Sequence, residues 1–241
     1  PLYSSAASDV YKRQPVEDMV RAGIAQGLQE MCLTDHVDLF RPRETAHWEH
    51  DFSNREETFA RADQAADGKI IVRRGIELGE AMRDFAYADE LLSRLPELDF
   101  VIGSQHQLSE KYDWNDLYFM PEATEQEARE QIADYLTLVL ETAKWGKFSV
   151  LGHLTLPLRY MNENHGMHMS FDGFEDEVAQ VFRALIENGC GIECNVNRGN
   201  TPLPDAKWLR LYHELSGEII TIGTDAEMQR FFAALDEILG A

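Results

Sequence analysis

Residues 148–153 read Phe148-Ser149-Val150-Leu151-Gly152-His153, an apolar run that ends in a histidine, and Arg159 follows in the loop behind it. The same arrangement recurs along the chain. Five further apolar runs end in polar residues, at Asp35-His36, Glu77, His106, Asn195 and Asp225. Segments with the apolar spacing of helices separate these runs. Short apolar runs that alternate with helical segments predict parallel strands joined by helical crossovers.

Such strands favour a barrel of the α/β class. In a barrel of parallel strands, polar residues at the carboxyl ends of the strands meet at one end and form the active site. One barrel accounts for a chain of 241 residues, so we expect a single domain over residues 15–241. Residues 1–14 show no strand pattern and no signal peptide. We therefore expect residues 1–14 to be a non-native, disordered head, and the first strand of the barrel to be missing or replaced.

The composition narrows the possible partners and the compartment. Acidic residues outnumber basic residues by 43 to 22, which gives a formal net charge of −21. This charge disfavours nucleic acid and anionic membranes as partners, and a solvated acidic surface is its simplest interpretation. Cys32, Cys190 and Cys194 lie in or beside apolar segments without metal-site spacing, as buried thiols of a reducing compartment do. No segment is long and apolar enough to span a membrane. We therefore expect a cytoplasmic protein, and the sequence leaves its oligomeric state open.

Ligand-type residues occupy one equivalent position in five predicted strand–helix units. They are His36, Glu77, His106, His153 and Asp225. Taken singly, a histidine at a strand end is more often a structural residue than a ligand, but five such residues at one position indicate a metal site. Imidazole nitrogens and carboxylates suit Zn, Mn or Fe, and a glutamate can hold two ions a few ångströms apart. The sequence therefore predicts a metal-dependent hydrolase.

The polar strand ends also form a family pattern. In chain order they are Thr34-Asp35-His36, Gly75-Ile76-Glu77, Gly103-Ser104-Gln105-His106, Gly152-His153, Ile192-Glu193-Cys194-Asn195 and Gly223-Thr224-Asp225-Ala226. This ordered set resembles the successive motifs of the PHP (polymerase and histidinol phosphatase) family. The resemblance covers about residues 15–241, and the spacing is closest to the monofunctional histidinol-phosphate phosphatases of that family.

The resemblance implies a distorted, TIM-like (β/α)7 barrel that holds up to three divalent metal ions. It implies that Glu77 bridges two ions, that His106 and His153 complete one of them, that Asp225 serves the ion sharing Glu77, and that His36 holds the third. It also implies hydrolysis of L-histidinol phosphate to L-histidinol and phosphate in histidine biosynthesis. His36, Glu77 and Asp225 would be the catalytic groups.

Arginines and acids near the strand ends suggest how a substrate is held. A guanidinium fork fits phosphate oxygens. Arg159, in the loop after His153, and Arg198, in the loop after Asn195, resemble the phosphate-binding arginines of the family, although loop arginines also fit a plain surface role. By charge complementarity, Asp113 and Asp116 are candidates for the cationic amine and imidazole of histidinol.

The chain departs from the family pattern at both ends. The family begins with a His-x-His strand and a metal-binding aspartate, and residues 1–14 contain no such motif. Its last motif ends in histidine where this chain has Glu227, which can offer an oxygen to a metal or begin the closing helix. We therefore expect fewer than three ions and weak or absent activity in this chain. The alternatives are a phosphoesterase for another small phosphate, such as a nucleotide, and a catalytically impaired metal-binding module.

Overall fold

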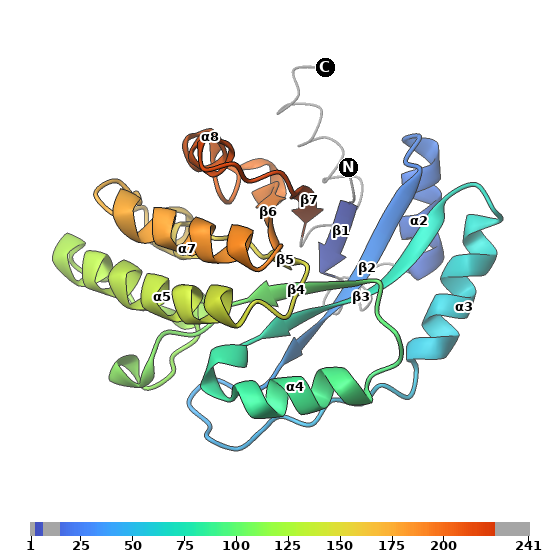
Figure 1. The fold of residues 1–241 in the computed structure, drawn as a ribbon, viewed down its shortest axis with the longest axis horizontal. Coiled ribbons are helices and arrows are strands. Elements are labelled where there is room, and N and C mark those ends of the chain that lie inside the picture. Colours follow the sequence, from blue (N-terminus) through green and yellow to red (C-terminus); the bar gives the residue numbers. More distant parts are fainter. Residues whose placement is uncertain (1–2, 7–14, 225–241) are drawn as a thin grey trace.

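The computed structural model describes residues 3–6 and 15–224 of the 241. Seven parallel strands form a closed barrel in the order β1 to β7 (Figure 1). The strands are β1 Tyr3–Ala6, β2 Glu30–Asp38, β3 Ile71–Gly79, β4 Phe100–Ser104, β5 Val150–Leu151, β6 Gly191–Asn195 and β7 Ile220–Thr224. Strand lengths range from two residues in β5 to nine in β2 and β3, so the barrel is distorted as expected.

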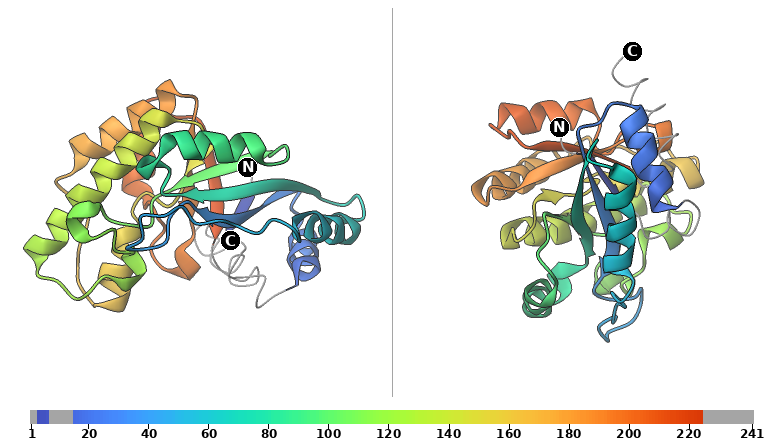
Figure 2. Two further views of the ribbon diagram at one scale, coloured as in Figure 1. Left: turned by 90° about the horizontal axis from the view of Figure 1, so that it is seen from below. Right: turned by 90° about the vertical axis from the view of Figure 1, so that its right-hand side faces the viewer.

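Helices cover the outside of the barrel. The longer ones are α2 Val16–Ala25, α3 Arg55–Ala66, α4 Phe85–Arg94, α5 Glu125–Trp145, α7 Glu175–Glu187 and α8 Ala206–Glu214. Helices α2 and α3 lie side by side on one flank, and α5 and α7 lie side by side on another (Figures 1 and 2). Short helical segments occupy the loops: η1 Ala81–Arg83, η2 Glu110–Tyr112, η3 Leu117–Phe119, α6 Leu156–Leu158, η4 Arg159–Asn164 and η5 Asn197–Gly199. None of the helices in residues 15–224 has the length and apolar character needed to cross a membrane.

The first strand position is occupied by residues of the head. Strand β1 pairs with β2, with Tyr3 opposite Met31, and with β7, with Tyr3 opposite Ile222. The expectation that residues 1–14 hold no strand is therefore wrong for residues 3–6, which form the first strand of the barrel. Its sequence, Tyr3-Ser4-Ser5-Ala6, contains no histidine. Asp225, Glu227 and the expected closing helix lie outside the described residues.

Strand register separates an inner face from an outer face. His36 lies opposite Glu77, and Glu77 lies opposite Ile102. Because side chains alternate along a strand, residues two apart share a face. Cys32 lies on the same face of β2 as His36 and forms one buried apolar cluster with Phe100, Ile102 and Val150. His36 lies four residues beyond Cys32 toward the carboxyl end of β2, and Glu77 lies beside it on β3. The imidazole of His36 and the carboxylate of Glu77 thus lie toward the carboxyl ends of their strands.

The main core lies outside the barrel, between its strands and helices α5, α7 and α8. Phe182 and Tyr212 meet edge to face within it, with ring centroids 5.2 Å apart. Cys32, Cys190 and Cys194 are buried and free, as expected of a chain without disulfides. This packing holds the crossovers against the strands and fixes the positions of the strand ends.

Candidate metal centre

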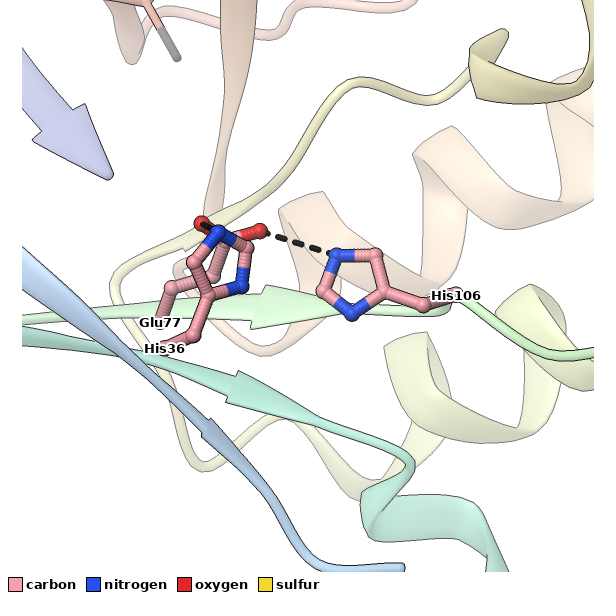
Figure 3. Close-up of side chains that lie close together, drawn as sticks. All are labelled: His36, Glu77 and His106. Atoms are coloured by element: carbon pink, nitrogen blue, oxygen red, sulfur yellow. Dashed lines mark hydrogen bonds and ion pairs between the residues drawn. The ribbon is translucent and has the colours of Figure 1, made fainter. Parts of the chain in front are cut away.

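The buried Glu77 is the centre of a cluster of histidines at the carboxyl end of the barrel. Its Oε1 lies 3.1 Å from His106 Nε2 and 3.0 Å from His153 Nε2. Its Oε2 lies 3.6 Å from His36 Nε2. Figure 3 shows His36 and His106 approaching the Glu77 carboxylate from different sides. The imidazole nitrogens therefore surround both oxygens of one carboxylate.

The local sequence positions each of these side chains. His36 and Glu77 lie within β2 and β3, whereas His106 and His153 lie two residues beyond the ends of β4 and β5. The Ser104 hydroxyl, at the end of β4, donates to Glu77 Oε1 at 2.8 Å. A Cβ at Gly152 would lie 2.5 Å from Ser104 Oγ. The glycine before His153 therefore leaves room for the hydroxyl that orients Glu77.

The charges of the cluster are coupled. Burial raises the pKa of Glu77, but the neighbouring His36, His106 and His153 outweigh it and hold that pKa well below its usual range. Burial likewise lowers the pKa of His106, but Asp38 and Glu77 outweigh it and hold that pKa well above its usual range. A carboxylate that stays ionised in a buried place needs positive charge beside it. In this chain the partner is either a protonated imidazole or a bound cation.

The donor set fits a divalent metal ion. His36, Glu77 and His106 each place a ligand atom within 4.8 Å of the others. Three Nε2 atoms and a carboxylate are the ligands that Zn, Mn and Fe prefer. His106 and His153 share Glu77 Oε1, while His36 faces Oε2. This arrangement suits a carboxylate that spans two neighbouring ion positions.

A buried chain of hydrogen bonds joins the cluster to Arg159. His153 N donates to Glu193 Oε2 at 3.0 Å, and Asn195 Nδ2 donates to the same oxygen at 3.4 Å. Arg159 donates through Nη2 to Asn195 Oδ1 at 3.2 Å and through Nε to Asn197 Oδ1 at 2.7 Å. Arg159 is only 5% exposed, so this expected phosphate ligand is a positioned residue and not a surface arginine.

The two expected phosphate-binding arginines, Arg159 and Arg198, differ in exposure and position. Arg159 lines a cavity of about 800 Å³ together with Asn162, Glu163, Asn197 and Asn200. Arg198 is exposed, has a left-handed backbone with φ 58°, and does not line this cavity. The cavity is not lined by Glu77 or by the three histidines around it, His36, His106 and His153. It therefore lies beside this candidate metal site and not over it.

The two expected substrate acids also differ. The side chain of Asp113 is 83% exposed and lies 3.9 Å from the guanidinium of Arg43. Asp116 is part-buried, and burial raises its pKa although Tyr118 N, His106 and His36 act against this. Leu117 N donates to His106 O at 2.8 Å, which joins the loop of Asp116 to one of the candidate metal ligands. Of the two acids, Asp116 is the one within electrostatic reach of the histidines.

The sequence did not single out Asp38, Glu80 or Glu193. Asp38 Oδ1 lies 2.9 Å from His106 Nδ1, and Glu80 Oε1 accepts from His106 N at 2.7 Å. Burial and the nearby Asp38 raise the pKa of Glu80 well above its usual range. Side chains two residues apart lie on one face of a strand, so Asp38 can be found from His36 on β2. The role of Glu193 has no such local signal, since it depends on His153, which follows β5.

The site lies at the carboxyl end of a parallel barrel, where α/β barrels have their active sites. Its imidazoles and shared carboxylate place the fold in the class of α/β barrels with a candidate metal site. The PHP domain model matches residues 8–197, and the chain belongs to this family. Histidinol-phosphatase of Lactococcus lactis is 28% identical over 235 residues, which cover 94% of this chain and 81% of that protein.

Solved structures show the same fold. The Lactococcus lactis histidinol phosphate phosphatase, crystallised with zinc, L-histidinol and phosphate, matches with a TM-score of 0.74 at 21% identity, over 100% of this chain and 94% of that one. A Listeria monocytogenes protein provisionally designated a histidinol phosphatase matches with a TM-score of 0.77 at 15% identity, over 95% of each chain. The expected distorted barrel of the PHP type is therefore confirmed.

Proposed function

We propose that this chain is a metal-dependent phosphomonoester hydrolase whose substrate is L-histidinol phosphate. The observation that carries the proposal is the placement of three imidazole Nε2 atoms around the Glu77 carboxylate. Membership of the PHP family and similarity to the Lactococcus lactis histidinol-phosphatase support the substrate. L-Histidinol and phosphate would be the products, as a step of histidine biosynthesis in the cytoplasm requires.

The metal-binding residues would be His36, Glu77, His106 and His153, with Asp225 as the further ligand that the family resemblance implies. Bound Zn, Mn or Fe would supply Lewis acidity toward a phosphate oxygen and would lower the pKa of bound water toward ~7. Glu77 would be ionised at neutral pH, because its pKa is held well below the usual range. The Ser104 hydroxyl would hold Glu77 Oε1 in place through their 2.8 Å hydrogen bond.

Arg159 would bind the phosphate group of the substrate. Asn195 and Asn197 accept hydrogen bonds from its Nη2 and Nε atoms, which fixes the plane of the guanidinium. A fixed guanidinium loses less conformational freedom when it binds a phosphate than a mobile one does. Arg198 would be a second, exposed phosphate ligand that has to reorient when the substrate binds.

Asp116 would recognise the cationic part of the substrate. Its loop meets the segment that carries Arg159, because Tyr118 and Tyr160 pack edge to face with ring centroids 5.9 Å apart. An acid on one side and a buried arginine on the other suit a molecule with an ammonium or imidazolium group and a phosphate. Asp113 points to solvent and provides a matched control on the same loop.

A phosphate-release assay tests the proposal. The purified chain, loaded separately with Zn²⁺, Mn²⁺ and Fe²⁺, is given L-histidinol phosphate, p-nitrophenyl phosphate and a nucleoside monophosphate. We expect turnover that is greatest with L-histidinol phosphate and that is lost with a chelator. His153→Ala should abolish it, whereas His213→Ala, an exposed histidine on α8, should not. Preference for the nucleotide would redirect the proposal to another PHP phosphoesterase.

The sequence of β1 favours a second candidate function, a metal-binding module with little turnover. Tyr3–Ala6 occupies the strand position where the family resemblance places two histidine ligands. This candidate predicts stoichiometric metal binding through His106 and His153 without phosphate release from any of the three substrates. Metal-dependent turnover comparable with that of an intact relative would exclude it.

A further inference from the structure

His106 is held by carboxylates at both of its ring nitrogens. Its Nε2 lies 3.1 Å from Glu77 Oε1, and its Nδ1 lies 2.9 Å from Asp38 Oδ1. Asp38 comes from β2, Glu77 from β3 and His106 from the loop after β4. The ring therefore cannot rotate without losing its contact with Asp38, and a hydrogen bond to an ionised carboxylate is roughly twice as strong as a neutral one.

Gly79 makes this arrangement possible. It lies opposite Asp38 in the register of β2 and β3. A Cβ at position 79 would lie 2.0 Å from Asp38 Oδ1 and 3.1 Å from His106 Nδ1. Any side chain here would displace the carboxylate from the imidazole, so the space left by the glycine is occupied by this hydrogen-bonded pair.

Glu80 fixes the backbone of His106. It is fully buried and adopts a left-handed conformation with φ 59°. A non-glycine residue in that conformation is strained and persists only where its surroundings hold it. Here its Oε1 accepts a hydrogen bond from His106 N at 2.7 Å. Three residues, Asp38 at the end of β2, Gly79 at the end of β3 and Glu80 directly after it, thus determine the position of His106.

We infer that Asp38 is a positioning residue for the metal centre: its carboxylate accepts the Nδ1 proton of His106 and so directs the Nε2 lone pair of that ring toward the ion beside Glu77. The inference rests on the proposed metal site and extends it to the residues behind the ligands. Carboxylates in this position fix the tautomer of a ligating imidazole and increase its basicity. Gly79 supplies the room, and Glu80 holds the backbone N–H of His106.

A second possible metal site would use the same carboxylates and the Nδ1 atom of His106 as ligands. Asp38, Glu80 and His106 also offer ligand atoms within 4.8 Å of one another, so they could hold a cation of their own. That site would need the Nδ1 lone pair of His106, which is absent when Nδ1 donates a proton to Asp38. One ring cannot do both, and the two arrangements predict different metal stoichiometries.

Metal titration of Asp38→Asn separates these possibilities. The substitution keeps the size of the side chain and removes its charge. We expect the dissociation constant for one Zn²⁺ ion to rise 10- to 100-fold, while the number of ions bound at saturation and the unfolding temperature of the metal-free chain stay close to those of the parent. Asp113→Asn, an exposed acid on a nearby loop, should leave the dissociation constant unchanged. Gly79→Ala should reproduce the loss although Asp38 is still present.

The outcomes are distinct. Loss of one ion at saturation would show that Asp38 is itself a ligand and would overturn the inference, as would an unchanged dissociation constant. A measurement on the unmodified chain does not depend on the variants: in the Zn²⁺-loaded protein, ¹⁵N NMR should show His106 protonated at Nδ1. An unprotonated Nδ1 would also overturn the inference. If the unmodified chain binds no divalent metal, the proposed function itself fails.

Discussion

Replacement of Glu77 by glutamine tests whether its charge holds the metal. The substitution preserves the shape of the side chain and one acceptor oxygen, but it removes the carboxylate that His36, His106 and His153 surround. A unit charge about 4 Å from a carboxylate gains about 4 kcal/mol at an effective dielectric constant of ~20, and a divalent ion gains about twice that. The amide dipole recovers part of this energy.

We therefore expect Glu77→Gln to weaken Zn²⁺ binding at least 100-fold, which corresponds to about 2.7 kcal/mol at about 1.36 kcal/mol per decade. Competition with a chromophoric chelator measures the dissociation constant, and metal analysis after dialysis measures the ions retained. Glu141→Gln is the control, because Glu141 is an exposed acid paired with Lys144 on α5. A dissociation constant for Glu77→Gln within threefold of the parent would refute the assignment of Glu77 as the shared ligand.

Three further outcomes follow from the described contacts. The pKa of His106 is raised, so a proton competes with the metal ion at Nε2. The affinity for metal should therefore increase with pH. Calorimetry in buffers of different ionisation enthalpy should detect the release of a proton when metal binds. Arg159→Lys loses the guanidinium fork and should raise KM for the phosphomonoester at least ~10-fold with a smaller effect on kcat, whereas the exposed Arg210→Lys should change neither. Phe182→Ala removes a fully buried ring and should cost about 3–5 kcal/mol in urea unfolding, while the exposed Gln180→Ala on the same helix should cost little.

The predicted strand and helix positions agree with the structure in most of the described chain. Apolar runs that end at polar residues form β2 to β7, and the segments with helical apolar spacing between them include α5 Glu125–Trp145. These elements were predictable because each carries its own period of apolar residues. The ends of β2 and β3 were not, since both strands continue two residues beyond the expected His36 and Glu77. That extension is what places Asp38 and Gly79 in register.

Strand β1 shows where local sequence is insufficient. Tyr3-Ser4-Ser5-Ala6 has no alternation of apolar and polar residues, and its strand conformation comes from pairing with β2 on one side and β7 on the other. The exposed edges of two neighbouring strands offer unpaired N–H and C=O groups that a segment of almost any sequence can satisfy. Tertiary context therefore decided this element, as it often overrides propensity in strands.

By itself, the sequence determined which residue types stand at the carboxyl ends of the strands. His36, Glu77, His106 and His153 were identified in this way, because one strand–helix unit follows another and each presents its last polar residue at the same end of the barrel. Only the tertiary structure decided how these groups pair: which nitrogen of His106 faces Glu77, that Asp38 holds the other, and that Glu193 and Asn195 link His153 to Arg159. The physical reason is that hydrogen bonds between strands depend on register and on distances of a few ångströms, which no single segment of the chain specifies.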